Sequence, residues 1–305
     1  MGMSPQDSDA GGKEARVRYW LDGALMEASD ARVSVLDHGF TVGDGVFETL
    51  KVLAGPAGRP VPFALDRHVA RLGRSAQGLG IQVPDPETVR AGALQVCAAN
   101  PELAAGGRLR ITLTSGAGPL GSDRGAAPVT LAMAVSPATP WAATSRLAVS
   151  PWPRNERSPV TGLKTTSYAE NVLMLAHAKR LGVDEAILPN LAGALCEGTG
   201  SNVFVVVDGV IVTPPLTSGC LAGITRELTL EWCAEAGIAC VERDVEMAAL
   251  ADVDEVFITS STRDVHPVTQ VLASDGSPLW AGDVGGRTRQ AAQAFAERAA
   301  ANWNP

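Results

Sequence analysis

The apolar residues of this chain recur with two periods, which predict where helices and strands lie. Residues 65–79 carry apolar side chains at helical spacing: Leu65, Val69, Leu72, Ala76 and Leu79. Residues 108–114 instead alternate polar and apolar side chains, as a strand with one buried face does. The first segment is therefore predicted to be an amphipathic helix and the second a strand.

The same two patterns run through most of the chain. Further helices are predicted at Pro86–Ala99, Tyr168–Leu181, Ile224–Ala236 and Val284–Ala299. Strands are predicted at Arg16–Trp20, Ala24–Glu27, Ala31–Leu36, Val46–Leu53, Val129–Val135, Leu147–Ser150, Glu185–Leu188, Val203–Val207, Val210–Thr213, Ile238–Arg243 and Val256–Thr259. Pro56–Pro62 is expected to be a loop.

The order of these elements predicts an α+β fold in two domains, as the length of 305 residues also favours. Residues 1–15 are rich in Gly, Ser and Asp and are expected to form a flexible lead. Residues 16–136 form a smaller domain, with a mostly antiparallel sheet and two helices. Residues 137–145 contain the only stretch typical of a linker, and residues 146–305 form the larger domain.

Composition and charge exclude several classes of function. A net charge of −8 argues against nucleic acid or an anionic membrane as the partner. No apolar run approaches the roughly 18 residues that a membrane span needs, and the amino terminus lacks the apolar core of a signal peptide. The five cysteines include no CxxC pair, so we expect reduced thiols in a cytoplasmic protein and no metal site.

Three segments carry side chains or backbone suited to one cofactor. Lys164 stands just before a predicted helix, and Glu197 opens the small-residue loop Glu197–Asn202. Gly223 precedes a third helix, whose first N–H groups can bind an anion. An amine for an aldehyde, a carboxylate for a ring nitrogen and a seat for phosphate are what pyridoxal 5'-phosphate requires.

In this order and spacing, the motifs resemble those of the class IV aminotransferases. That family of pyridoxal-phosphate enzymes includes branched-chain aminotransferases, D-amino-acid aminotransferases and 4-amino-4-deoxychorismate lyases. The resemblance runs from about Val17 to Phe295. The motifs that carry it are Ser34–Asp37, Gly43–Glu48, His68–Leu72, Lys164 with Tyr168, Glu197–Asn202 and Gly223–Arg226.

The resemblance implies roles for the main site residues. Lys164 matches the lysine that forms a Schiff base with the cofactor and then removes the Cα proton of the amino substrate. Glu197 matches the carboxylate that pairs with the pyridine nitrogen. Arg71 matches an arginine that binds the phosphate, and Tyr168 matches a tyrosine near the phenolic oxygen.

Weaker matches complete the predicted site. Further phosphate contacts are implied for Gly223, Ile224, Thr225 and either hydroxyl of Ser261 and Thr262. Candidate substrate-binding residues are Thr49, Arg110, Ser115 and Arg263. No histidine is assigned to catalysis.

The resemblance also implies a two-domain fold of type IV, with the cofactor in the cleft between the domains. It further implies a homodimer that acts on a small amino substrate and a keto acid. The stretch Gly43–Thr49 favours the lyase and D-amino-acid branches, whereas Glu197–Asn202 leans towards branched-chain enzymes. The two former branches usually carry an arginine where this chain has Ser115.

The leading hypothesis is a 4-amino-4-deoxychorismate lyase that releases pyruvate and 4-aminobenzoate. The alternative is a transaminase acting on branched-chain amino acids, D-amino acids or amines. A more remote alternative, which would leave Lys164 without a role, is a pyridoxal-phosphate-binding protein without catalytic activity.

Overall fold

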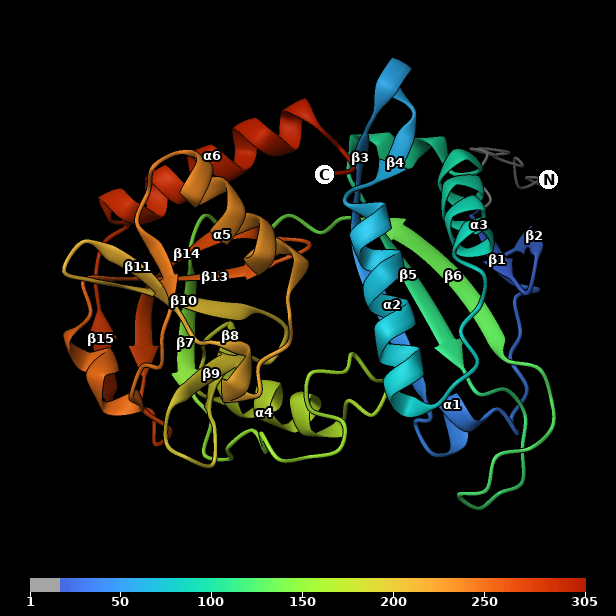
Figure 1. Ribbon diagram of the computed structural model, residues 1–305, viewed down its shortest axis with the longest axis horizontal. Helices are drawn as coiled ribbons and strands as arrows, with labels where there is room; N and C mark the ends of the chain where they lie inside the picture. The colour runs from blue at the N-terminus through green and yellow to red at the C-terminus, as the bar shows by residue number, and fades with distance from the viewer. Residues whose placement is uncertain (1–16) are drawn as a thin grey trace, which may run out of the picture.

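The structure, a computed structural model, describes residues 17–305. The flexible lead expected at residues 1–15 lies outside the described residues. Within them the chain forms two β-sheets, each covered by helices, which stand side by side in Figure 1. The fold is therefore α+β, as the sequence predicts.

The first sheet has six strands in the order β2-β1-β6-β5-β3-β4, and neighbouring strands are antiparallel. Its strands are β1 (Arg18–Leu21), β2 (Ala24–Glu27), β3 (Gly45–Ala54), β4 (Pro60–Pro62), β5 (Gly107–Thr114) and β6 (Thr130–Pro137). The helices α2 (Leu65–Leu79) and α3 (Pro86–Ala98) cover one face of it, and the short α1 (His38–Thr41) precedes β3.

The two faces of this sheet differ in chemistry because side chains alternate along each strand. On β5, Leu109 and Ile111 are fully buried in the core that includes Leu72 of α2. Arg108 and Arg110 lie on the opposite face of the sheet. On that face their neighbours from β3 are Lys51 and Thr49. This polar face is turned towards the second sheet, because Lys51, which pairs with Arg108, bonds Asp264 of the second sheet.

The second sheet has nine strands, of which eight follow the order β12-β11-β10-β13-β14-β7-β8-β9 and the last, β15, pairs with β14. They are β7 (Ser145–Val149), β8 (Glu185–Pro189), β9 (Leu195–Gly198), β10 (Asn202–Val207), β11 (Val210–Thr213), β12 (Cys240–Glu242), β13 (Glu255–Ser260), β14 (Asp264–Leu272) and β15 (Pro278–Ala281). The pairs β7–β8, β7–β14 and β11–β12 are parallel, and the others are antiparallel.

Three helices pack on this sheet: α4 (Ala169–Arg180), α5 (Ile224–Glu235) and α6 (Gly286–Ala301). The core beneath α5 and α6 contains the stacked rings of Phe204 and Phe257, whose centroids are 4.7 Å apart. Short 3-10 helices lie at Pro56–Gly58, Pro101–Ala105, Leu216–Ser218 and Met247–Asp252.

The chain end ties the two halves together. After α6 the chain returns to the first half, where Ala64 N donates to Trp303 O over 2.8 Å. Arg67 of α2 donates two hydrogen bonds of 2.8 Å to Glu231 of α5. These contacts hold α2 against α5, which matters because both helices supply parts of the site.

Most predicted elements are present, with ends that match or differ by one or two residues. The strand predicted at Ala31–Leu36 is wrong, because this segment has no strand pairing and exposes Val33 and Val35. The loop predicted at Pro56–Pro62 instead ends in β4, which pairs with Val52–Ala54 of β3. The strands β9, β14 and β15 have no predicted counterpart, since polar residues interrupt their apolar pattern.

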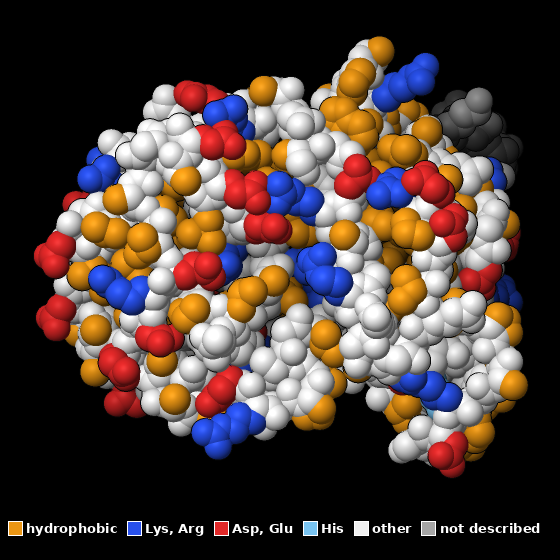
Figure 2. Space-filling model, viewed as in Figure 1, with side chains coloured by type: hydrophobic (Ala, Val, Ile, Leu, Met, Phe, Trp, Pro, Cys, Tyr) orange, Lys and Arg blue, Asp and Glu red, His pale blue; other side chains and the backbone are white. Residues whose placement is uncertain are grey.

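The face shown in Figure 2 does not present one large field of a single sign. Acidic and basic side chains are interspersed over the face shown in Figure 2. Across residues 17–305, no helix combines the length and apolar character needed to cross a membrane.

We expect Glu255→Ala to destabilise the fold by about 1–2 kcal/mol, because a buried carboxylate then no longer caps a helix. Glu255 accepts hydrogen bonds from Arg287 N and Thr288 N in the first turn of α6, at 3.0 and 2.8 Å. Urea unfolding measures the free energy. Glu297→Ala, on an exposed position of α6, is the control, and an equal loss in both variants would contradict the capping role.

Candidate active site

Lys164 is fixed at the edge of the first sheet by backbone hydrogen bonds. The short strand β4 pairs only with the far end of β3, so the edge at Gly45–Phe47 is free to pair with another segment. The segment around Lys164 takes this place: Phe47 N donates to Lys164 O over 2.9 Å, and Thr166 N donates to Gly45 O over 2.8 Å. A loop of the second half thus pairs with the edge of the first sheet, through a bridge between Val46 and Thr165.

The amine of Lys164 lies in surroundings that favour its neutral form. Nζ is 4.4 Å from the centroid of the Phe47 ring. Burial, reinforced by the charge of Arg71, lowers the pKa of Lys164 to about 8. An unprotonated amine is nucleophilic, so this lysine can react with a carbonyl group near neutral pH.

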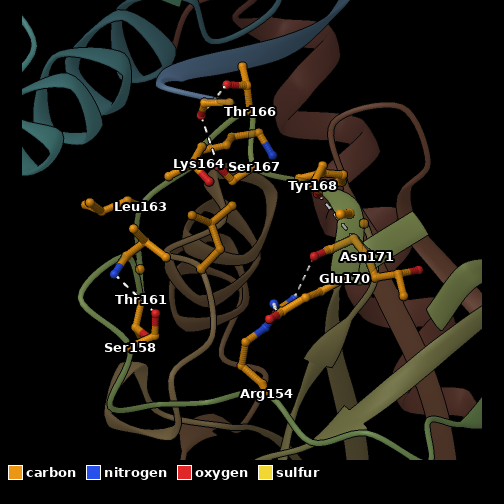
Figure 3. A pocket seen from close by; sticks show the side chains of 18 of the residues that line it. Arg154, Ser158, Thr161, Leu163, Lys164, Thr166, Ser167, Tyr168, Glu170 and Asn171 are labelled. Atoms are coloured by element: carbon orange, nitrogen blue, oxygen red, sulfur yellow. Dashed lines mark hydrogen bonds and ion pairs between the residues drawn. The ribbon is translucent and has the colours of Figure 1, made fainter. Parts of the chain in front are cut away.

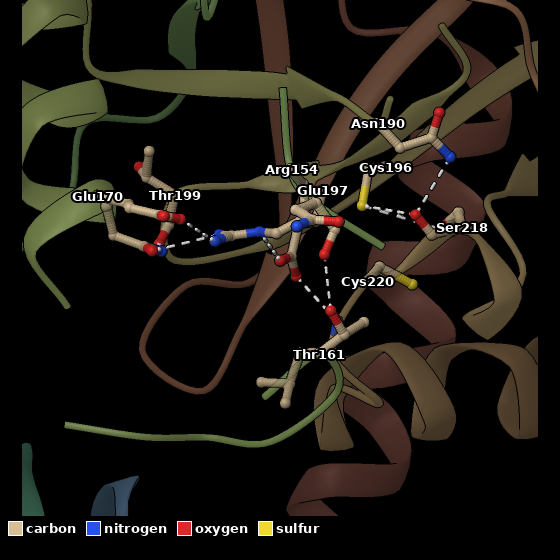
Figure 4. A network of polar contacts seen from close by, with 12 residues as sticks. Arg154, Thr161, Glu170, Asn190, Cys196, Glu197, Thr199, Ser218 and Cys220 are labelled. Carbon is tan, nitrogen blue, oxygen red and sulfur yellow. Dashed lines mark hydrogen bonds and ion pairs between the residues drawn. The ribbon is translucent and has the colours of Figure 1, made fainter. Parts of the chain in front are cut away.

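Glu197 lies on β9 and is held on both carboxylate oxygens. Arg154 Nε donates to Oε1 over 3.2 Å (Figure 4), and Leu221 N donates to Oε2 over 2.9 Å. Burial raises the pKa of Glu197, and the charge of Arg154 opposes that rise. The Glu197 carboxylate, paired with the Arg154 guanidinium, therefore lines the cavity described below.

Arg154 and Asn171 are site residues that the sequence alone did not reveal. Arg154 Nη2 donates to Asn171 Oδ1 over 3.2 Å, and Asn171 Nδ2 donates to Thr199 O over 2.6 Å. The hydroxyl of Tyr168 donates to the same carbonyl over 3.3 Å, which places Tyr168 beside Glu197. Arg154 follows a Pro-rich stretch without periodic pattern, so no local signal marks it.

Arg71 of α2 is held by a buried carboxylate, Glu48 of β3. Its Nε and Nη2 donate to the two oxygens of Glu48 over 2.8 and 2.7 Å. Nδ1 of His68 is 2.6 Å from the same carboxylate. These partners hold the pKa of Glu48 far below its usual range even though the side chain is fully buried. The motif stretches at Gly43–Glu48 and His68–Leu72 therefore meet in one ion-paired cluster.

The start of α5 lies beside Arg71 and is open to an anion. Arg71 Nη1 donates to Ala222 O over 2.9 Å, just before the helix begins. Ile224 and Thr225 are buried, yet no side chain of the described residues caps the helix. A side chain at position 223 would displace Asn202, because a Cβ there would lie 1.9 Å from Asn202 Oδ1. Buried N–H groups without a cap are typical of a phosphate seat.

A cavity of about 670 Å³ connects several of these groups. Figure 3 shows Lys164, Tyr168, Arg154 and Asn171 around it, and Glu197 also lines it. The cavity has an amine at one side and an ion-paired carboxylate at the other. Together with the open start of α5, it has the three features that pyridoxal phosphate requires, so the residues present fit that cofactor.

The remaining residues predicted for the site are more dispersed. Ser261, Thr262 and Arg263 form the turn between β13 and β14, where Thr262 lines a second cavity and Arg263 forms a buried ion pair with Glu185. Ser115 donates its hydroxyl to Asp44 over 2.6 Å.

Arg110 lies on the polar face of the first sheet. Its guanidinium carbon is 3.3 Å from the centroid of the Phe47 ring, and β-sheet pairing places Thr49 beside it. Burial lowers the pKa of Arg110 to about 10, so it remains a cation at neutral pH. Phe47 contacts both Arg110 and Lys164, so these two basic side chains lie close to the same aromatic ring.

Comparisons with known proteins agree with this geometry. The family model described as amino-transferase class IV matches residues 45–271. The D-alanine aminotransferase of Bacillus licheniformis is 33% identical over 285 residues, which cover 90% of this chain and 94% of that protein.

Solved structures show the same fold. The branched-chain aminotransferase of the archaeon Thermoproteus uzoniensis, solved with norvaline, superimposes with a TM-score of 0.84 at 29% identity, covering 92% of this chain and 94% of that one. The T.th. branched-chain amino acid aminotransferase, solved with pyridoxamine 5'-phosphate, gives a TM-score of 0.80 at 27% identity, covering 92% and 93%. The chain therefore belongs to the class IV aminotransferases, enzymes that use pyridoxal phosphate.

Proposed function

We propose that this enzyme is a transaminase that moves an amino group between an α-amino acid and an α-keto acid. The observation that carries the proposal is that Lys164 and Glu197 line one cavity. Arg71, whose charge acts on Lys164, bonds Ala222 O just before α5 begins. The relatives named above are branched-chain and D-alanine aminotransferases, which supports transamination over the lyase reaction that the sequence favours. Ser115 stands where the lyase and D-amino-acid branches usually carry an arginine, and its hydroxyl donates to Asp44.

In this proposal Lys164 is the catalytic residue. Bound pyridoxal phosphate supplies an aldehyde for the amino substrate and a ring that accepts electrons from its Cα. With cofactor and substrate bound, the neutral Nζ of Lys164 would remove the Cα proton of the substrate and hold that proton for its return to the product. The lowered pKa of Lys164 suits an amine that must both accept and donate a proton near neutral pH.

Glu197 pairs with the ring nitrogen in this arrangement. Because Arg154 and Leu221 N bond its two oxygens, the carboxylate keeps its charge and its direction despite burial. The hydroxyl of Tyr168 bonds Thr199 O. In this proposal Tyr168 contacts the phenolic oxygen of the cofactor.

Arg71 and the first turn of α5 bind the phosphate. Glu48 orients the guanidinium, so the cationic group is in place before the cofactor arrives. The N–H groups of Ile224 and Thr225 supply donors, with Gly223 allowing their close approach, and a hydroxyl of Ser261 or Thr262 completes the seat.

Arg110 binds the carboxylate of the substrate, with Thr49 as its neighbour. Among the other candidates, Arg263 is already paired with Glu185 and Ser115 with Asp44. Arg110 donates only one weak hydrogen bond, of 3.4 Å, to the Thr112 hydroxyl. Its guanidinium is therefore available to bind a carboxylate.

A homodimer is part of the proposal. Residues 33–42 expose five large apolar side chains: Val33, Val35, Leu36, Phe40 and Val42. Phe40 and Val42 also line the cavity of Lys164, so a second copy seated on this segment would close the cavity. All five cysteines, which lie in the described part of the chain, are free thiols, and this supports a cytoplasmic location.

The proposed function is tested by a screen of amino donors and keto acceptors, run beside a pyruvate-release assay with 4-amino-4-deoxychorismate. We expect amino transfer with the wild type, no transfer with Lys164→Ala, and wild-type transfer with Lys179→Ala, an exposed lysine on α4. Pyruvate release from aminodeoxychorismate without transfer to any keto acid would instead establish the lyase.

Covalent attachment of pyridoxal phosphate to the apoenzyme should become faster as the pH rises, with a midpoint near 8, because only the unprotonated Lys164 attacks the aldehyde. Stopped-flow absorbance on both sides of that pH measures the rate. A midpoint at the ordinary lysine value of about 10.4 would show that the site does not lower this pKa.

We expect Glu197→Gln to retain the cofactor but to slow Cα proton removal by about a hundredfold or more, because the ring loses its charged partner. Deuterium exchange at the substrate Cα measures this step directly. Glu170→Gln is the matched control, since Glu170 is exposed and also contacts Arg154, at 3.5 Å. Exchange at the wild-type rate in the Glu197 variant would refute the pairing.

A further inference from the structure

Glu185 is a buried carboxylate at the start of β8, and the chemistry proposed above gives it no task. Its Oε1 accepts hydrogen bonds from Gly200 N over 2.7 Å and from the Ser201 hydroxyl over 2.8 Å. Its Oε2 pairs with Arg263 from the turn between β13 and β14. Glu185 therefore holds the loop that follows Glu197 by direct bonds to two residues of that loop.

One peptide group of this loop is bonded on both sides. It joins Thr199 to Gly200, and its N–H is the group that donates to Glu185. Its carbonyl, Thr199 O, accepts from the Tyr168 hydroxyl over 3.3 Å and from Asn171 Nδ2 over 2.6 Å. Glu185 and the Tyr168 hydroxyl are thus the two ends of one short chain of hydrogen bonds.

A chain of this kind transmits the effect of a charge through a peptide group. A carboxylate that accepts from the N–H polarises the peptide, so that its carbonyl oxygen becomes a stronger acceptor. The Tyr168 hydroxyl has one proton to donate. Thr199 O, strengthened by Glu185, therefore competes for this proton with any acceptor bound in the cavity that Tyr168 lines.

The charges around Tyr168 keep its hydroxyl protonated. Burial is the main cause of a raised pKa of Tyr168, followed by the charge of Glu197. Glu185 raises this pKa further, whereas Arg154 and Arg110 lower it. Since the ordinary pKa of tyrosine is already about 10, Tyr168 is a neutral donor at neutral pH. What a neighbour can change there is the direction in which Tyr168 donates.

We propose that Glu185 is a positioning residue, which acts through the peptide group between Thr199 and Gly200 to set how strongly Tyr168 donates to the phenolic oxygen of the cofactor. The inference rests on the placement of Tyr168 at that oxygen, which is part of the proposed function. In the wild type, Glu185 draws the hydroxyl towards Thr199 O. Glu185→Gln keeps an acceptor for Gly200 N but removes its charge, so Tyr168 should then donate more strongly to the cofactor.

The pH at which the visible absorbance of the bound cofactor changes tests this inference, because a stronger donor at the phenolic oxygen favours its anionic form. The variants are Glu185→Gln and Glu185→Asp, which keeps the charge but withdraws it from Gly200 N. Asp184→Asn is the matched control, since it removes the adjacent acidic side chain, whose carboxylate accepts from Arg146 N over 2.8 Å. Each variant is measured alone and combined with Tyr168→Phe.

We expect Glu185→Gln to lower the midpoint of this change by about half a pH unit or more, and Glu185→Asp to lower it by less. Asp184→Asn should keep the wild-type midpoint. In the Tyr168→Phe background, the effect of Glu185→Gln should fall to less than about half, because the residue through which Glu185 acts is gone.

The apoenzyme gives a second readout, which does not involve the cofactor. The chain contains two tyrosines, so Tyr19→Phe leaves Tyr168 as the only phenol whose ionisation changes the ultraviolet absorbance. In this background Glu185→Gln should lower the pKa of Tyr168, and Asp184→Asn should not. Because Glu185→Asp retains a charged partner for Arg263, it serves as the folded variant if Glu185→Gln does not fold.

Three results would overturn this inference alone. They are a wild-type midpoint in both Glu185 variants, a Glu185→Gln shift of undiminished size in the Tyr168→Phe background, and an unchanged pKa of Tyr168 in the Glu185→Gln apoenzyme. If Tyr168→Phe by itself leaves the midpoint unchanged, the placement of Tyr168 in the proposed function is wrong, and the inference is overturned with it.

Discussion

The backbone pairing between the Lys164 segment and the edge of β3 is the contact on which the site depends. It crosses from the second half of the molecule to the first, so it fixes the lysine relative to both sheets at once. The pairing is possible because β4 is short and leaves that part of β3 unpaired. Backbone hydrogen bonds fix position without using the side chain, and the amine therefore remains free to react.

Around this contact, buried side chains of opposite charge occur in pairs. Glu48 holds Arg71 on one side, and Arg154 holds Glu197 on the other. Removing one member of either pair would leave its partner charged and poorly solvated. In the proposed arrangement, Arg71 would meet the phosphate of the cofactor and Glu197 its ring already oriented, so that little reorganisation would be needed on binding.

The sequence predicts the fold and much of the site, because both depend on local patterns. Apolar periodicity locates α2 and α5, and small residues around Glu197 and Gly223 indicate close backbone approach. It does not predict that Glu48 holds Arg71 or that Arg154 backs Glu197, because these partners are 23 and 43 residues apart and meet only in the folded chain. The strand expected at Ala31–Leu36 fails because apolar residues there lie on the surface.

The alternation along β5 has a consequence for how such an enzyme can evolve. Leu109, Ile111 and Leu113 maintain the packing beneath α2 and α3, while the residues between them face the cleft. A mutation at a cleft position alters what the enzyme recognises and leaves the packed layer intact. Selection can therefore adjust substrate choice on this strand almost independently of folding, which offers a physical route by which one scaffold acquires many specificities.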